Sequence, residues 1–161
     1  MAIRSAVKTI VVRKGSILLI KYISERGFVH YELPGGGQEQ FETMEEAARR
    51  EFLEETGYHI KIDKFVALAE EIFLDKELRE NYPNYAHRIL HIFQAEIISE
   101  DLTIDKEIVF DKNQVGCEWI PIERVSDVYL IPRPVKDRLS EIINSKSPIY
   151  LSTSYEAINL N

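Results

Sequence analysis

The chain of 161 residues contains one cysteine, Cys117, and no long apolar run. A single thiol can form neither an intrachain disulfide nor a zinc cluster of thiolates, so a reducing, cytoplasmic setting is expected. The longest aliphatic runs, such as residues 17–20, are far shorter than the ~20 residues that span a bilayer. Because the first residues also lack the apolar core of a signal peptide, we predict no association with a membrane.

Positive charge is also scarce, since 20 Lys and Arg stand against 27 Asp and Glu and give a formal charge of −7. An acidic surface repels a phosphate backbone, so binding to nucleic acid polymers is not expected. The same charge suits a protein that concentrates divalent cations, although a solvated acidic surface is its commoner cause. The hydrophobic content of 45% is enough for one domain with a core of its own.

No repeat, linker or low-complexity tract divides the chain, so residues 1–144 are predicted to form one domain, followed by an unassigned C-terminal segment, 145–161. The pattern predicts more strands than helices, and the two kinds do not alternate regularly, which favours an α+β class with helices against a mixed sheet. Strands are expected at 6–12 and 17–22, joined as a hairpin, and at 31–33, 58–62, 65–74, 88–98 and 115–122. Residues 76–86 are expected to form a polar loop, and helices are expected at 43–56, 122–125 and 135–144.

The helix at 43–56 has the clearest signals. Thr43 can cap its start, Glu46 three residues later completes a capping box, and Gly57 is placed to end it. A glycine-rich turn, residues 34–37, precedes this helix and favours an irregular backbone.

Helical spacing places Glu51 and Glu55 in the middle of the apolar stripe of this helix, with Glu54 on its margin. Two carboxylates beside apolar surface are unfavourable unless a positive group joins them. Their oxygens, with carbonyls of the glycine turn, suit a hard cation such as Mg²⁺ or Mn²⁺. Taken alone, this pattern is equally compatible with a solvated, charged face of the helix.

The stretch from Gly36 to Gly57 resembles the Nudix box, in which glycine, five residues, glutamate and seven residues precede Arg-Glu-aliphatic-x-Glu-Glu-x-Gly-aliphatic. All seven fixed positions are matched, by Gly36, Glu42, Arg50, Glu51, Glu54, Glu55 and Gly57. Phe52 and Tyr58 are aromatic where the family usually has aliphatic residues. The similarity extends over about residues 4–143, with 33–37 as the usual lead-in to the box and 118–122 as a late strand around Trp119.

This resemblance implies a Nudix-type α/β/α sandwich with a mixed sheet. It also implies a Mg²⁺- or Mn²⁺-dependent hydrolase that cleaves a nucleoside diphosphate linked to another moiety, and therefore a small nucleotide-type substrate. By position, Glu51 and Glu55 match the main metal ligands and Glu54 a further ligand or the catalytic base. The Gly35 carbonyl matches a backbone ligand. Three residues match supporting positions: Arg50, which braces the helix carboxylates, and the acids Glu42 and Glu39.

Family members often recruit another acid from a loop before the late strand. In this chain Asp111 or Glu118 could serve, but Asn113 and Gln114 are nearest to the expected place. By residue type, the candidates for binding substrate are Arg26, Arg88, Tyr31 and Glu118. Exposed strand edges commonly dimerise in this family, so a homodimer is possible.

Two alternatives remain open at this point. A Nudix-fold binding or sensor module would recognise a nucleotide without cleaving it, although it would not need three helix carboxylates in register. An isomerase of prenyl diphosphates would need a cysteine and glutamate pair, for which Cys117 offers no clear support.

Overall fold

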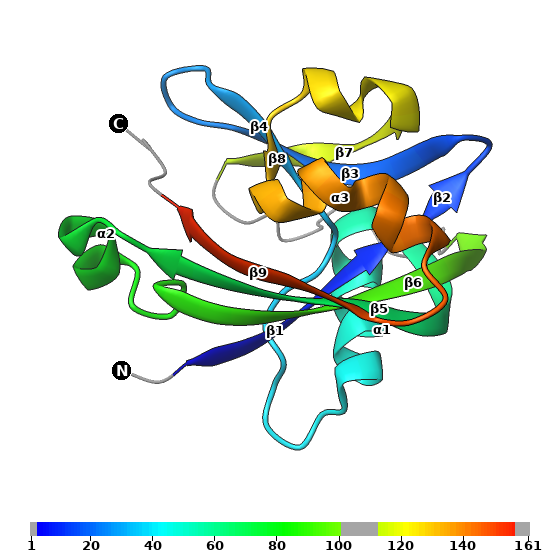
Figure 1. The fold of residues 1–161 in the computed structure, drawn as a ribbon, viewed down its shortest axis with the longest axis horizontal. Helices are drawn as coiled ribbons and strands as arrows, with labels where there is room; N and C mark the ends of the chain where they lie inside the picture. The colour runs from blue at the N-terminus through cyan, green and yellow to red at the C-terminus, as the bar shows by residue number, and fades with distance from the viewer. Residues whose placement is uncertain (1–2, 101–112, 157–161) are drawn as a thin grey trace.

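The computed structural model describes residues 3–100 and 113–156 (Figure 1). Strands and helices follow one another without regular alternation, as the α+β class requires. The strands are β1 (Arg4–Ile10), β2 (Val12–Arg13), β3 (Ser16–Ile23), β4 (Val29–Glu32), β5 (Tyr58–Phe73), β6 (His87–Glu100), β7 (Gln114–Pro121), β8 (Leu130–Ile131) and β9 (Ile149–Glu156). The helices are α1 (Met44–Thr56), α2 (Lys76–Asn81), the 3₁₀ helix η1 (Ile122–Asp127) and α3 (Arg133–Asn144).

These strands form two mixed sheets. The first sheet has the order β1-β6-β5-β9, in which β5 and β6 are antiparallel and both outer strands run parallel to their neighbours. The second has the order β2-β3-β4-β8, and β7 also pairs with β3. Parallel pairing of β4 with β8 makes this sheet mixed as well.

Two helices cover opposite faces of the first sheet. Val7 of β1 packs with Ala47 and Ala48 of α1, whereas its neighbour Ala6 belongs to the cluster that contains Val135 of α3. Adjacent residues of a strand point to opposite faces, so α1 and α3 lie on either side of this sheet (Figure 1). The layers agree with the α/β/α sandwich that the sequence predicts. Among the described residues, no helix is long and apolar enough to cross a bilayer.

The start and end of α1 confirm the predicted helix. The Thr43 hydroxyl accepts a hydrogen bond from the backbone N–H of Glu46, and the Glu46 carboxylate accepts one from the Thr43 backbone N–H at 2.8 Å. Gly57 ends the helix in the left-handed conformation, with φ of 74°, and donates its N–H to the Leu53 carbonyl. Local interactions therefore define both ends of α1.

The glycine-rich turn runs along the free edge of β1. The N–H of Val7 donates to the Gly36 carbonyl at 2.9 Å, and the N–H of Thr9 donates to the Pro34 carbonyl at 2.8 Å. A side chain at Gly35, whose φ is 133°, would place its Cβ 2.2 Å from the Val7 carbonyl oxygen. The turn can approach the strand this closely only because that position is glycine.

Two expectations about local structure are wrong, and two others are confirmed with a difference in detail. The run at 6–12 does not pair with 17–22, because β1 joins β6 in the other sheet and only the two-residue β2 forms a hairpin with β3. The expected loop at 76–86 begins with the short helix α2, which Asp75 caps by accepting a hydrogen bond from the Leu78 N–H. The expected strands at 58–62 and 65–74 are one strand, β5, with irregular register. The expected helix at 122–125 is a 3₁₀ helix.

The segment left unassigned by the sequence contains β9, which extends the first sheet beside β5. Leu151 of β9 is 1% exposed and belongs to the core cluster with α3, whereas its neighbour Tyr150 is 58% exposed. This alternation is that of a strand with one buried face. Residues 149–156 are therefore part of the sheet.

We predict that Leu151→Ala lowers the free energy of unfolding by about 3 kcal/mol, because it removes buried apolar contacts and leaves a cavity. Tyr150→Ala is the matched control and should change the free energy of unfolding by less than about 1 kcal/mol. Urea unfolding followed by circular dichroism measures both. Equal stability of the two variants would contradict the assignment of β9 to the core.

Candidate active site

A cleft of about 510 Å³ lies where the end of α1 meets the glycine turn and the two sheets. Its floor carries the box acids Glu51, Glu54 and Glu55. One wall comes from β1, β6 and the segment after α2, and the facing wall comes from β3, β4 and the start of β7. The cleft brings together elements that are far apart in the sequence.

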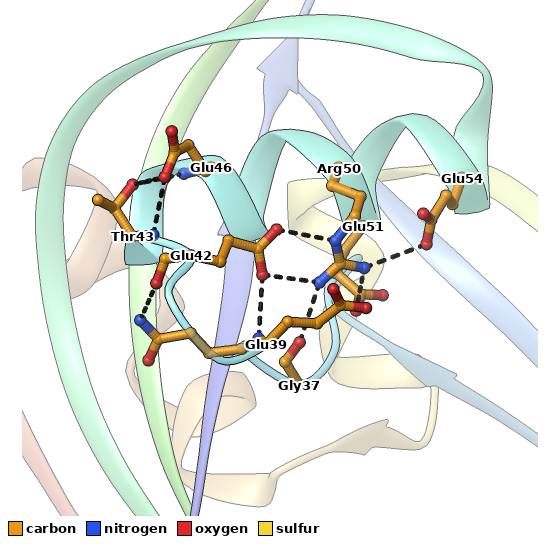
Figure 2. A network of polar contacts seen from close by, with 9 residues as sticks. Gly37, Glu39, Glu42, Thr43, Glu46, Arg50, Glu51 and Glu54 are labelled. Atoms are coloured by element: carbon orange, nitrogen blue, oxygen red, sulfur yellow. Dashed lines mark hydrogen bonds and ion pairs between the residues drawn. The ribbon is translucent and has the colours of Figure 1, made fainter.

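Arg50 links Glu42, Glu51 and Glu54 to one another and to the turn (Figure 2). Its Nε and Nη2 donate to the two carboxylate oxygens of Glu42 at 2.8 and 3.0 Å, and Nη2 also donates to the Gly37 carbonyl at 3.1 Å. Its Nη1 donates to Glu51 at 2.8 Å and to Glu54 at 3.3 Å. These bonds raise the pKa of Arg50 and lower the pKa of Glu42. The geometry supports the bracing role implied by the resemblance.

Glu39 acts through its backbone. Its N–H donates to a Glu42 carboxylate oxygen at 3.0 Å (Figure 2), and its own side chain is exposed. The predicted support from Glu39 is thus a main-chain contact that helps to orient Glu42.

Glu51 and Glu55 face the glycine turn. A Cβ at Gly36 would lie 2.4 Å from a Glu51 carboxylate oxygen, so the Glu51 side chain fills the space that glycine leaves open. The Glu55 carboxylate accepts a hydrogen bond from the Gly35 N–H at 2.6 Å. Burial raises the pKa of Glu55 to about 8, although the nearby charge of Lys8 acts in the opposite direction. The charged form of Glu55 is therefore only partly compensated by its surroundings.

Glu54 differs from the other two acids of the box. Its side chain is 58% exposed, which agrees with its predicted place on the margin of the helix stripe, and it also lines the cleft. An exposed carboxylate at the cleft floor is accessible to water and to substrate.

Lys8 is a buried cation at the site that the sequence did not identify. Its side chain is 4% exposed, and its ammonium donates to the Gly35 carbonyl at 2.7 Å and to a Glu32 carboxylate oxygen at 3.0 Å. Burial alone would raise the pKa of Glu32, but the charges of Lys8 and Arg88 outweigh it and hold that pKa below its ordinary value. The sequence signal that could have identified Lys8 is its place inside a run of β-branched residues, where a buried side chain is expected.

The side chains present fit a hard divalent cation in part. Glu51 and Glu55 supply carboxylate oxygens beside the turn. A bound cation would stabilise the negative charge of Glu55, which its present neighbours stabilise only in part. The Gly35 carbonyl already accepts from Lys8, which leaves its second lone pair for a metal. Over residues 3–100 and 113–156, no group of three or more Asp, Glu, His and Cys side chains is gathered for metal binding. Among the predicted metal ligands, Glu51 and Glu55 are therefore the side chains whose placement fits a divalent cation.

The residues predicted by type to bind substrate are distributed unevenly. Arg88 lines the cleft, where its guanidinium bonds to Glu71 and lies 5.4 Å from the centre of the Tyr85 ring. Arg26 is exposed in the turn between β3 and β4 and does not line the cleft. Asp111, one candidate for an additional acid, lies outside the described residues.

Tyr31 and Glu118 lie on the wrong face of the second sheet for this role. The Tyr31 hydroxyl donates to Glu118 at 3.0 Å, while His30 and Glu32, on either side of Tyr31, line the cleft. Because side chains alternate along a strand, Tyr31 and its partner point away from the cleft. The structure thus corrects both predictions.

Arg4 is a further residue of the cleft that the sequence did not single out. Its guanidinium lies beside Gly37 and 5.0 Å from the centre of the Tyr85 ring. Among the described residues, no carboxylate forms an ion pair with it, whereas Arg88 on the neighbouring strand is paired with Glu71. A guanidinium stacked on an aromatic ring and lacking a carboxylate partner is a good ligand for phosphate.

The cleft of this α+β protein thus combines two carboxylates at the end of a helix, a glycine turn against them and an arginine on one wall. The family model described as the NUDIX domain matches residues 2–139, and the chain belongs to this family.

Known proteins agree with this assignment. The chain is 30% identical to the nucleoside triphosphatase NudI of Enterobacter sp. (strain 638), over 79% of this chain and 88% of that protein. It is also 30% identical to the NAD-capped RNA hydrolase NudC of Salmonella schwarzengrund, over 76% of this chain, but it spans only 39% of NudC. The crystal structure of MutT from Bacillus halodurans has the same fold, with a TM-score of 0.71 at 20% identity, covering 99% of this chain and 94% of that one.

Membership of the family and these relatives identify the chain as a Nudix-type hydrolase of phosphoric anhydride bonds. The family generally uses divalent metal ions. The alternatives of a sensor module and of a prenyl diphosphate isomerase gain no support from the relatives.

We predict that Glu32→Gln destabilises the protein by about 3 kcal/mol near neutral pH, because it leaves the Lys8 ammonium buried without its carboxylate. The folded-state pKa of Glu32 lies below its unfolded value, so this stabilisation is present above the unfolded pKa of 4.5 and is lost as pH falls through the folded pKa. The difference between wild type and variant should therefore shrink in acid. Urea unfolding at a series of pH values measures it.

Glu118→Gln provides the control, because it breaks a lysine pair in which the carboxylate is 45% exposed. It should change the free energy of unfolding by less than about 1 kcal/mol. A Glu32→Gln variant as stable as this control at neutral pH would show that the buried pair does not stabilise the site.

Proposed function

We propose that this protein is a metal-dependent pyrophosphohydrolase that cleaves a small nucleotide-type substrate, a nucleoside diphosphate linked to another moiety. The observation that carries the proposal is the convergence of Glu51 and Glu55 on the glycine turn, within a cleft that also presents Arg4. Carboxylate oxygens and a cationic side chain on facing sides suit a pyrophosphate and its counter-ion.

Glu51 and Glu55 would hold Mg²⁺ or Mn²⁺, with the Gly35 carbonyl as a further oxygen. When bound, the ion supplies positive charge to the pyrophosphate oxygens and makes water easier to deprotonate. Glu54, which is exposed at the cleft floor, would accept the proton of the attacking water or add a further oxygen ligand. Arg50 holds Glu51 and Glu54 in place through its hydrogen bonds.

Arg4 would bind the phosphate chain on the wall opposite β3 and β4. Arg88 lies next to it in the register of β1 and β6, but the charge of Arg88 is already compensated by Glu71. Of the two arginines, Arg4 would therefore attract a phosphate more strongly than Arg88.

Nucleoside triphosphates are the first substrates to test, because NudI is named for hydrolysing them and this chain covers most of its length. The shorter overlap with NudC makes a capped RNA the weaker candidate. The net charge of −7 also favours free nucleotides over a nucleic acid polymer. A cytoplasmic location remains our prediction.

We predict that Glu51→Gln and Glu55→Gln each lower kcat at least about a hundredfold, because each removes a negative oxygen from the floor of the cleft. Glu45→Gln is the matched control, since Glu45 is on the same helix, 57% exposed and outside the cleft. Phosphate or nucleotide release from a panel of nucleoside triphosphates, with Mg²⁺ or Mn²⁺, measures kcat. Wild-type rates in the double variant of Glu51 and Glu55 would refute the proposal.

We predict that Gly36→Ala weakens Mn²⁺ binding about tenfold without unfolding the protein. The added Cβ would lie 2.4 Å from a Glu51 oxygen, so the carboxylate must move away from the turn. Calorimetric titration with Mn²⁺ measures the affinity, and thermal unfolding checks the fold. In the Glu51→Gln background the same substitution should have little further effect, since the group that it displaces is already changed. Additive losses would mean that Gly36 acts through another part of the turn.

A further inference from the structure

Gln114, the first residue of β7, places a buried amide at the cleft. Its side chain is 7% exposed, and its Nε2 atom has no hydrogen-bond partner among the described residues. Gln114 nevertheless lines the cleft. An unpaired buried N–H is unfavourable, so a polar group that is buried beside a binding cleft is best explained by a ligand that pairs with it.

Two aromatic side chains lie next to this amide. Tyr22 is the register partner of Gln114 across β3 and β7, and its ring stacks on that of His30, with centroids 5.0 Å apart and planes 9° from parallel. Both rings line the cleft. Burial lowers the pKa of His30, against the opposing charge of Glu32, so the imidazole is neutral at physiological pH. This part of the wall thus combines two flat rings with the buried amide donor of Gln114, and the nearby Glu32 carboxylate is already paired with Lys8.

The facing wall has a different chemistry. It carries the cations Arg4, Lys8 and Arg88, whereas the lysine of β3, Lys21, points away from the cleft toward Glu118. A nucleotide has the same division, because its phosphates are charged and its base is a flat ring with neutral hydrogen-bond acceptors at its edge. The two walls therefore match the two ends of such a molecule.

We propose that Gln114 and the adjacent Tyr22 form the pocket for the nucleobase of the substrate. Gln114 donates a hydrogen bond from Nε2 to a carbonyl oxygen or ring nitrogen of the base, and the Tyr22 ring, held flat by its stack on His30, packs against the plane of the base. Gln114 is then a residue that determines which base is accepted. This inference rests on the proposed function, since it assumes that the phosphorylated substrate is a nucleotide.

The test measures binding separately from hydrolysis. Calorimetry with Mg²⁺ and α,β-methylene nucleoside triphosphates gives the Kd of each natural base and of unsubstituted purine, which lacks the exocyclic groups. In wild type we expect at least a tenfold spread of Kd among the bases. Gln114→Met keeps the side-chain length and removes the donor, so it should weaken the best ligand about fivefold and reduce the spread.

Gln94→Met is the matched control. Gln94 also has an amide atom, Oε1, that is buried without a partner, but Gln94 does not line the cleft. Nucleotide affinities of this variant should equal those of wild type. Thermal unfolding of both variants checks that each protein is folded.

Gln114→Glu separates base recognition from metal binding. A carboxylate cannot donate, so this variant should lose the same preference among bases as Gln114→Met, with unchanged Mn²⁺ affinity. Tighter Mn²⁺ binding with an unchanged base preference would overturn the proposal and place position 114 at the metal. An unchanged Kd for every base in Gln114→Met would also overturn it.

The proposed function and this inference fail in different ways. If wild type binds nucleotides with a base preference that depends on Gln114 but hydrolyses none of the matching triphosphates, the proposed triphosphate hydrolysis fails and the base pocket stands. If wild type hydrolyses the triphosphates and Gln114→Met leaves every KM unchanged, the function stands and the base pocket is refuted. If wild type binds none of the analogues, the base pocket is refuted as well.

Discussion

The candidate site depends on the pairing of the glycine turn with the free edge of β1. This pairing turns the N–H of Gly35 toward Glu55 and its carbonyl toward Lys8, so the backbone of one residue contacts both an acid and a cation of the site. It also covers the backbone of an edge strand that would otherwise be open to pairing with another chain. Side chains would prevent the close approach, since a Cβ at Gly35 would collide with the Val7 carbonyl. Glycine at position 35 is therefore required by the backbone contact itself.

The parts of the fold that the sequence predicts well are those defined by local interactions. The capping box of Thr43 and Glu46 and the left-handed Gly57 lie within 15 residues of one another and involve no distant partner. Strand pairing is different, because a run of β-branched residues does not specify which neighbour it will join. The predicted hairpin failed for this reason, since β1 pairs with β6, more than 80 residues away. The strand β9 was missed because its buried Leu151 stands among exposed and polar neighbours.

The site residues show the same difference between positions that local spacing determines and positions that depend on contacts between distant elements. Helical spacing placed Glu51 and Glu55 in the inward stripe of the helix and Glu54 on its margin, because one helix determines all three positions, and in the structure all three line the cleft with Glu54 58% exposed. Tyr31 and Glu118 were chosen by residue type, and the alternation of β4 puts them on the other face. The place of Lys8 at the site depends on packing between elements from different parts of the chain, and no spacing rule could have predicted it.

The arrangement of charge explains why a cation and an anionic substrate would belong together in this cleft. Glu42, Glu51 and Glu54 share the single guanidinium of Arg50, and Lys8 is hydrogen-bonded to Glu32 while lying close to Glu55. Even with the pKa of Glu55 raised to about 8, the carboxylates of this network outnumber its two cations, so a divalent ion would offset the excess negative charge for an approaching phosphate. Arg4 has no carboxylate partner among the described residues and lies on the wall rather than on the floor. The phosphate chain would then be drawn to a bound ion on one side and to Arg4 on the other, and the base would remain for the wall that carries the Tyr22 and His30 rings.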